Sequence, residues 1–128
     1  MRLFVAHFAL LEEELWLAKR APWEVLRSIE TYRLVSQLFA AGDAELAYEK
    51  ASKMIGGMSD SNCDGAGDRT DIKCLGIYDL EEIMLGEIAL AEAIFEPYGI
   101  DVGCVRWPGT NLFSRDKNEL SLFKHNEN

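Results

Sequence analysis

The sequence is poor in the residues from which most catalytic and redox sites are built. It has two histidines among 128 residues and three cysteines, Cys63, Cys74 and Cys104, which share no C-x-x-C spacing. An odd number of scattered cysteines favours neither a disulfide framework nor a zinc site, and it is typical of a reducing compartment. There is no Glu-x-x-His pair of the kind that di-iron bundles use, and no glycine-rich phosphate loop followed by Lys and Ser or Thr. No enzyme class is therefore recognisable from a local motif.

Long apolar runs and basic residues are also scarce. No run approaches the ~20 residues that span a bilayer, and thirteen Lys and Arg stand against twenty-two Asp and Glu, a net charge of −9. This charge repels phosphate backbones and anionic lipids, so we expect no nucleic acid and no membrane as partner. The first residues, MRLFVAHFALLEEELW, match a signal peptide poorly, because His7 interrupts the apolar segment and three glutamates follow it. We expect a cytoplasmic protein.

The hydrophobic pattern that is present predicts a mainly α-helical protein. Apolar residues recur at spacings of three and four over residues 3–20 and again over 22–41, as on a helix with one buried face. The prediction is a single domain that resembles a four-helix bundle.

Helix start and stop signals predict the third and fourth helices. Asp43 is placed to cap a helix of about a dozen residues, which Gly56-Gly57 would end. Asp79 and Glu82 resemble a capping box, which would open the most apolar helix of the chain, residues 80–95.

Two short segments outside the predicted helices have the composition of strands. Residues 72–78 and 100–107 could pair as a two-stranded β ribbon, although the first could also be an irregular approach to the fourth helix. Residues 1–107 are expected to form the helical domain. Residues 108–128 are polar and are expected to be a C-terminal extension that is partly docked or disordered.

Four polar residues border or enter the apolar faces of the predicted helices. They are His7, Glu14, Arg33 and Glu87. A carboxylate on a core face must be paired, hydrogen-bonded or protonated. If the four residues converge, they form a polar pocket for a small molecule or cation; the alternative is an ion-pair network, for example between Glu87 and Arg33.

Two tryptophans are candidates for an interface. On a helical wheel, Trp16 and Trp23 point away from the apolar faces of the first two segments. Tryptophan is enriched at interface hot spots. The alternative is that both rings pack on the C-terminal segment or cover a helix end.

In the stretch SDSNCDGAGDRTD, residues 59–71, acidic and amide residues recur at short intervals on both sides of Gly65. It resembles an EF-hand calcium loop that begins at Asp60. That resemblance implies a Ca²⁺ or Mg²⁺ site with oxygen ligands, and the predicted ligands are Asp60, Asn62, Asp64, Asp68 and Asp71.

The flanks of this loop depart from the EF-hand pattern. Gly56-Gly57 precedes it and Gly76 interrupts the segment after it, where an EF-hand has two continuous helices. Position 12 holds Asp71 in place of the usual glutamate, which is one methylene longer. The alternative is a solvated linker without a bound ion.

Taken together, these features predict a small acidic helical module that binds a protein partner or a second copy of itself and has no enzymatic activity. We expect no cofactor. The alternatives are a Ca²⁺- or Mg²⁺-binding protein using the loop at residues 60–71, and small-molecule binding in the polar pocket of the bundle.

Overall fold

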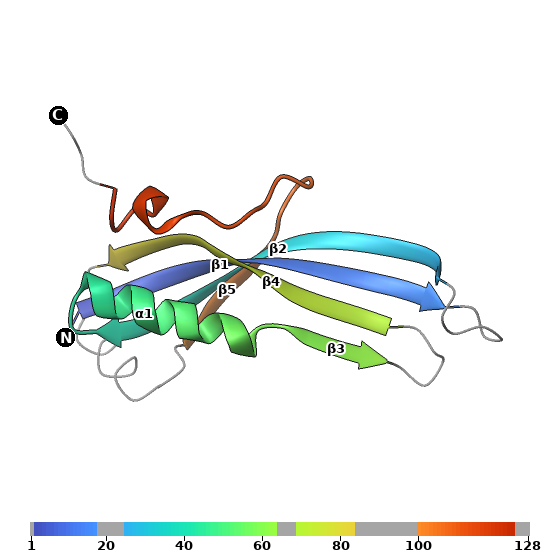
Figure 1. Ribbon diagram of the computed structural model, residues 1–128, viewed down its shortest axis with the longest axis horizontal. Coiled ribbons are helices and arrows are strands. Elements are labelled where there is room, and N and C mark those ends of the chain that lie inside the picture. Colours follow the sequence, from blue (N-terminus) through green and yellow to red (C-terminus); the bar gives the residue numbers. More distant parts are fainter. Residues whose placement is uncertain (1, 18–24, 64–68, 84–99, 125–128) are drawn as a thin grey trace.

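The computed structural model describes residues 2–17, 25–63, 69–83 and 100–124, and these residues form one antiparallel sheet with one α-helix. The strand order across the sheet is β3-β4-β1-β2-β5 (Figure 1). The elements are β1 (Arg2–Leu17), β2 (Val25–Ala41), α1 (Ala44–Met54), β3 (Asp60–Cys63), β4 (Arg69–Ile83) and β5 (Ile100–Arg106), with short 3₁₀ turns at Ile55–Gly57 and Lys117–Glu119.

The predicted helical bundle is wrong. The segments 3–20 and 22–41 contain the long strands β1 and β2, which pair with each other along almost their whole length. The predicted fourth helix begins inside β4, and residues 84–95 of it lie outside the described part of the chain. The protein is mainly β.

The burial of β1 explains why its sequence suggested a helix. Phe4, Ala6 and Phe8 are buried on one face of the sheet, and Leu3 and Val5 are buried on the other. A strand that is covered on both faces loses the alternation of apolar and polar residues. The resulting continuous run of apolar residues fits the period of a helix as well as that of a strand.

The predicted β ribbon is wrong in its pairing, although both of its segments are strands. Residues 72–78 belong to β4, and residues 100–107 contain β5. Because β1 and β2 lie between them in the sheet, β4 and β5 do not pair with each other.

Helix α1 has nearly the bounds that the sequence predicted, and it covers one face of the sheet. Asp43 caps it, since an oxygen of its side chain accepts a hydrogen bond from the Leu46 N–H at 2.9 Å. Ala47 and Ala51 are fully buried and let the helix approach the sheet closely. We call this covered side face A. Its core comprises Phe4, Ala6, Phe8, Phe39, Ala41, Ala47, Ala51, Met54, Ile77, Leu80 and Leu120.

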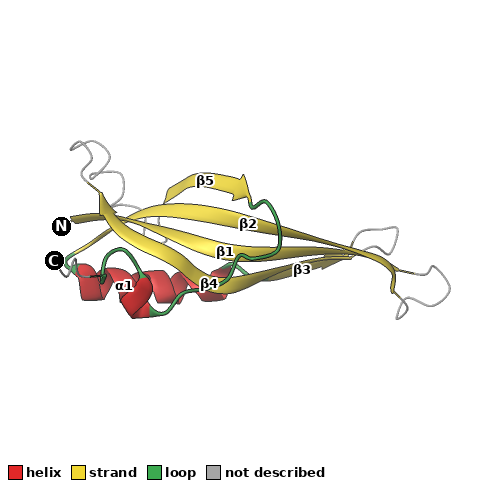
Figure 2. Cartoon of the chain, turned by 90° about the horizontal axis from the view of Figure 1, so that it is seen from above, coloured by secondary structure: helices red, strands yellow, loops and turns green. Residues whose placement is uncertain are grey.

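The opposite side, face B, is crossed by the first part of residues 107–124, which we call the C-terminal segment. The Trp107 N–H donates to the Tyr32 carbonyl of β2 at 2.7 Å. The Trp107 ring also packs near the Tyr78 ring of β4, and the two ring centroids are 5.3 Å apart. Since β1 separates these two strands, the segment must pass over β1, as Figure 2 shows.

The C-terminal segment then follows β4 and returns to α1. The Arg115 N–H donates to the Ile77 carbonyl at 2.8 Å, and the Leu122 N–H donates to the Leu80 carbonyl at 2.9 Å. Farther along, Phe123 packs edge-to-face on Tyr48 of α1, with ring centroids 5.8 Å apart. The segment therefore belongs to the folded unit at least to Lys124, where the described residues end.

Candidate functional site

Of the four residues predicted to line a polar pocket, the three that the structure describes, His7, Glu14 and Arg33, are not brought together by the sheet. His7 and Glu14 lie seven residues apart on β1, which is about 23 Å in an extended chain, and they face opposite sides because side chains alternate. Arg33 forms an ion pair with Glu12 at 2.7 Å, and this hydrogen bond raises the pKa of the guanidinium. Glu87 lies outside the described residues.

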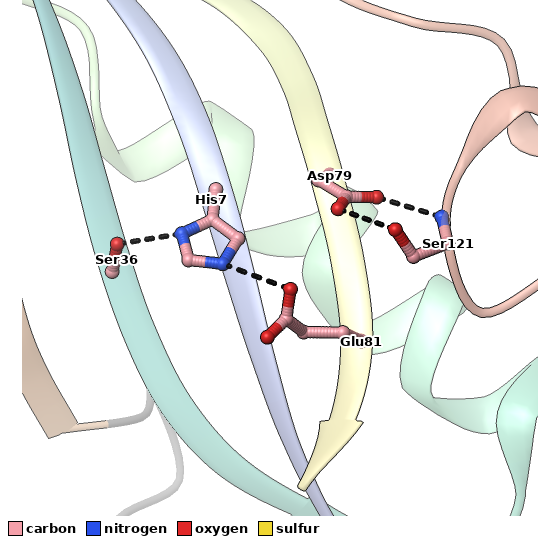
Figure 3. Close-up of polar contacts among 5 residues, drawn as sticks. All are labelled: His7, Ser36, Asp79, Glu81 and Ser121. Atoms are coloured by element: carbon pink, nitrogen blue, oxygen red, sulfur yellow. Dashed lines mark hydrogen bonds and ion pairs between the residues drawn. The ribbon is translucent and has the colours of Figure 1, made fainter.

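His7 instead forms a polar row across three strands. Its Nδ1 lies 2.7 Å from the Ser36 hydroxyl on β2, and its Nε2 lies 3.5 Å from a carboxylate oxygen of Glu81 on β4 (Figure 3). The imidazole is 23% exposed and the Glu81 side chain is 45% exposed. The sequence did not reveal this row, because the contact between His7 and Ser36 depends on the register of β1 and β2.

A histidine between a hydroxyl and a carboxylate is also the arrangement that activates a serine nucleophile. In this row, however, the contact to Glu81 is longer than a good hydrogen bond, and the carboxylate is largely in water. Glu81 therefore does not orient the imidazole firmly. We interpret the row as cross-strand stabilisation of face B.

Asp79, next to this row, holds the C-terminal segment. Its carboxylate accepts hydrogen bonds from the N–H of Ser121 at 2.7 Å and from the hydroxyl of the same serine at 2.6 Å (Figure 3). This aspartate was predicted to cap a helix. It does satisfy a backbone N–H, but that N–H comes from a residue 42 positions later in the chain.

Of the two tryptophans predicted as an interface, Trp16 lies near the end of β1. Trp16 is 39% exposed, and the Arg27 guanidinium of the neighbouring strand lies over its ring, 4.5 Å from the centroid. This contact is a cation–π pair, which accounts for part of the ring's surface. Trp23 lies outside the described residues.

The predicted calcium loop begins in a strand. Asp60 and Asn62 belong to β3, which pairs with β4, so a strand stands where an EF-hand has the first part of its loop, and β4 stands where it has its outgoing helix. Asp71 is on β4 and forms an ion pair with Arg69 at 3.1 Å, whereas Asp64 and Asp68 lie outside the described residues. Among the residues that the structure describes, no three His, Cys, Asp or Glu side chains are grouped so as to hold a metal ion.

The two edge strands of the sheet, β3 and β5, differ in length and in their surroundings. On one side, the four-residue β3 pairs with residues 69–72 of β4, and the C-terminal segment bonds to Ile77 and Leu80 of β4. On the other side β5 is the last strand, and within the described ranges no segment pairs with its outer side (Figure 2). Residues 102–106 are all exposed.

Hydrogen bonding shows which backbone groups of β5 point outward. The Trp107 N–H is bonded to Tyr32 of β2, so it points into the sheet. Because N–H and C=O groups of alternate residues point the same way, Val105 also faces β2, whereas Cys104 and Arg106 direct their N–H and C=O groups outward. Two residues of this edge therefore offer four backbone groups that pair with none of the segments the structure describes.

The open edge also exposes large apolar side chains. Val105 is 61% exposed and Val102 is 51% exposed. The register shifts at Val102, because Gly103 pairs with Ser36 and Asp101 pairs with the next residue of β2, so Val102 is a bulge. A pocket of about 350 Å³ lies beside the other end of the edge, and its lining includes Tyr32, Arg106 and Trp107.

Comparison of the chain with protein families, with curated proteins and with solved structures gives no match. In the described part of the chain, no helix has the length and apolar character that crossing a membrane requires.

Proposed function

We propose that this protein is a non-enzymatic protein-interaction module that binds an extended segment as an additional β-strand along the outer side of β5. The observation that carries this proposal is the exposed outer side of β5, where residues 102–106 are all exposed and the backbone groups of Cys104 and Arg106 face outward. The opposite edge strand, β3, has only four residues, and the C-terminal segment lies along β4 beyond it. An uncovered edge is a template for pairing with another strand.

The chemistry of β5 supports strand addition. The outward N–H and C=O groups of Cys104 and Arg106 supply hydrogen bonds that do not depend on the partner's sequence. Val105 supplies an apolar contact between them, and burying an exposed valine side chain contributes roughly 1.5–3 kcal/mol. Side chains of the added segment that lie beside Trp107 and the adjoining pocket would supply specificity.

A matched pair of variants tests this proposal. Proline at position 104 removes one outward N–H but no hydrogen bond of the sheet, whereas Cys104→Ala changes the same side chain and keeps the N–H. The probe is a phage-displayed library of random twelve-residue peptides, selected on the wild-type chain. We expect the selected peptides to bind Cys104→Ala as they bind wild type, and to lose binding to Cys104→Pro.

Thermal unfolding of both variants checks that they are folded. As a second readout that needs no proline, a selected peptide should slow hydrogen exchange of the Cys104 and Arg106 amides. Peptides that bind equally to Cys104→Pro, that leave both amides unprotected, or that cannot be selected at all would contradict strand addition at β5.

A further inference from the structure

The backbone of β5 restricts how a second strand can lie against it. The outward-facing residues are Cys104 and Arg106. The bulge at Val102 interrupts the edge on one side, and Pro108, which has no N–H to donate, ends it on the other. The regular part of the edge is therefore the five residues 103–107, with the sequence GCVRW.

These five residues are complementary to themselves in one antiparallel register. If Val105 of one copy lies opposite Val105 of a second copy, then Cys104 of each copy lies opposite Arg106 of the other. Both of these residues face outward, so the two pairs form four backbone hydrogen bonds. A two-fold axis through the central valines relates the two copies, as a symmetric dimer requires.

The neighbouring symmetric registers are poorer. Centring the axis on Cys104 would place Arg106 opposite the bulged Val102, and centring it on Arg106 would place Cys104 opposite Pro108. Each of these registers keeps one fully bonded pair of outward residues. The register centred on Val105 is the one that matches both outward residues and avoids the bulge and the proline.

Side chains also match in the register centred on Val105. The two valines, each 61% exposed in a single copy, would meet as a pair without direct hydrogen bonds, in which side chains approach most closely. Trp107 of each copy would lie opposite Gly103 of the other. The Trp107 ring itself turns inward over the sheet to Tyr78, and a Cβ atom added to Gly103 would meet nothing within 4 Å, so neither residue obstructs the second copy at this position.

We propose that the strand added to β5 is the β5 strand of a second copy of this chain, in the antiparallel register that places Val105 opposite Val105. This proposal rests on the proposed function, since it names the occupant of the same edge. The stretch GCVRW contains one basic and no acidic residue, so all of the acidic side chains lie elsewhere on each copy.

Two properties of this dimer follow from its size and charge. Five residues a side bury little area, so association is expected to be weak. Long-range repulsion between two chains of charge −9 is screened by salt, so added sodium chloride strengthens the dimer.

Disulfide trapping tests the register even for a weak dimer. In a Cys104→Ala background, Val105→Cys places two cysteines opposite each other in a pair whose Cα atoms are about 4.5 Å apart, which a disulfide accepts. Val102→Cys in the same background is the control, because it has similar exposure but lies outside the register. Under a glutathione redox buffer we expect at least about tenfold more covalent dimer from Val105→Cys.

Replacing the Cys104→Ala background by Cys104→Pro should reduce this yield to that of the control. Equal cross-linking of Val105→Cys and Val102→Cys, or none from either, would overturn the self-pairing. If peptides selected on the chain still bound at β5 in that case, the proposed function would stand with a different partner. If they did not, both proposals would fail.

Discussion

At the scale of single residues, one glycine of β4 lets the C-terminal segment approach the sheet. Gly76 has a φ of +130°, a conformation that other residues rarely adopt, and a Cβ atom built on it would lie 2.6 Å from the Cβ of Ser114. No L side chain fits there without displacing either the strand or the segment. Face B thus depends on the absence of a side chain at this position.

Gly76→Ala is therefore expected to destabilise the fold by at least about 1–3 kcal/mol, because it adds backbone strain and a clash. Gly57→Ala is the control, since its added methyl group would meet nothing within 4 Å and its φ is not positive. Urea unfolding of the two variants measures the difference. Equal stability of Gly76→Ala and wild type would show that the segment does not pack against β4 in this way.

One of the two predicted helix caps is right and the other is wrong, since Asp43 caps α1 whereas Asp79 and Glu82 lie within β4. Asp79 and Glu82 have the spacing of a capping box, yet Asp79 bonds to Ser121 and Glu82 forms a bidentate pair with Arg2 of β1. Both partners are far away in sequence. The spacing of two acidic residues alone cannot distinguish a helix cap from two side chains that bond to segments on opposite sides of a strand.

At the scale of elements, α1 could be predicted from the sequence and the long strands could not. The bounds of α1 depend on local signals, namely the Asp43 cap and the glycines that follow Met54. The strands depend on the partners across the sheet, and burial of both faces removes their alternation. The candidate site, too, could be predicted only in part. Residues 100–107 were recognised as a strand, but only the strand order makes β5 an edge.

The C-terminal segment is held by backbone hydrogen bonds, by the buried Leu120 and by polar side chains, among which Asp79 supplies two hydrogen bonds. Asp79→Ala removes both hydrogen bonds to Ser121 and leaves that N–H without its carboxylate partner. We expect a loss of about 1.5–3 kcal/mol, as for hydrogen bonds to charged groups. Ser121→Ala, which keeps the N–H bond, is expected to lose less.

Hydrogen exchange locates the effect of Asp79→Ala. Amides of residues 115–124 should exchange faster, whereas those of α1 at Ala47 and Ala51 should exchange only as fast as the global loss of stability requires. Uniform acceleration along the whole chain would contradict the view that Asp79 anchors this segment specifically.

At the scale of the whole molecule, the sheet ends on one side in the four-residue β3 with the C-terminal segment beyond it along β4, and on the other side in β5, whose outer side pairs with no described segment. The C-terminal segment starts at the open edge, crosses face B and covers the β4 edge, so a single connection distinguishes the two sides (Figure 2). Natural sheets usually cover, shorten or charge their edges. On β5, the bulge and Pro108 limit the open edge to five residues, which confines pairing to one short register.

Hydrogen exchange of the amides of residues 104–107, measured on the wild-type chain from about ten micromolar to about one millimolar, tests this account most directly. At the lowest concentration Val105 and Trp107, which face β2, should be protected, and Cys104 and Arg106 should not. At the highest concentration Cys104 and Arg106 should become protected as well. If those two amides are protected already at the lowest concentration, or stay unprotected at the highest, the account of β5 as an open, self-pairing edge is contradicted.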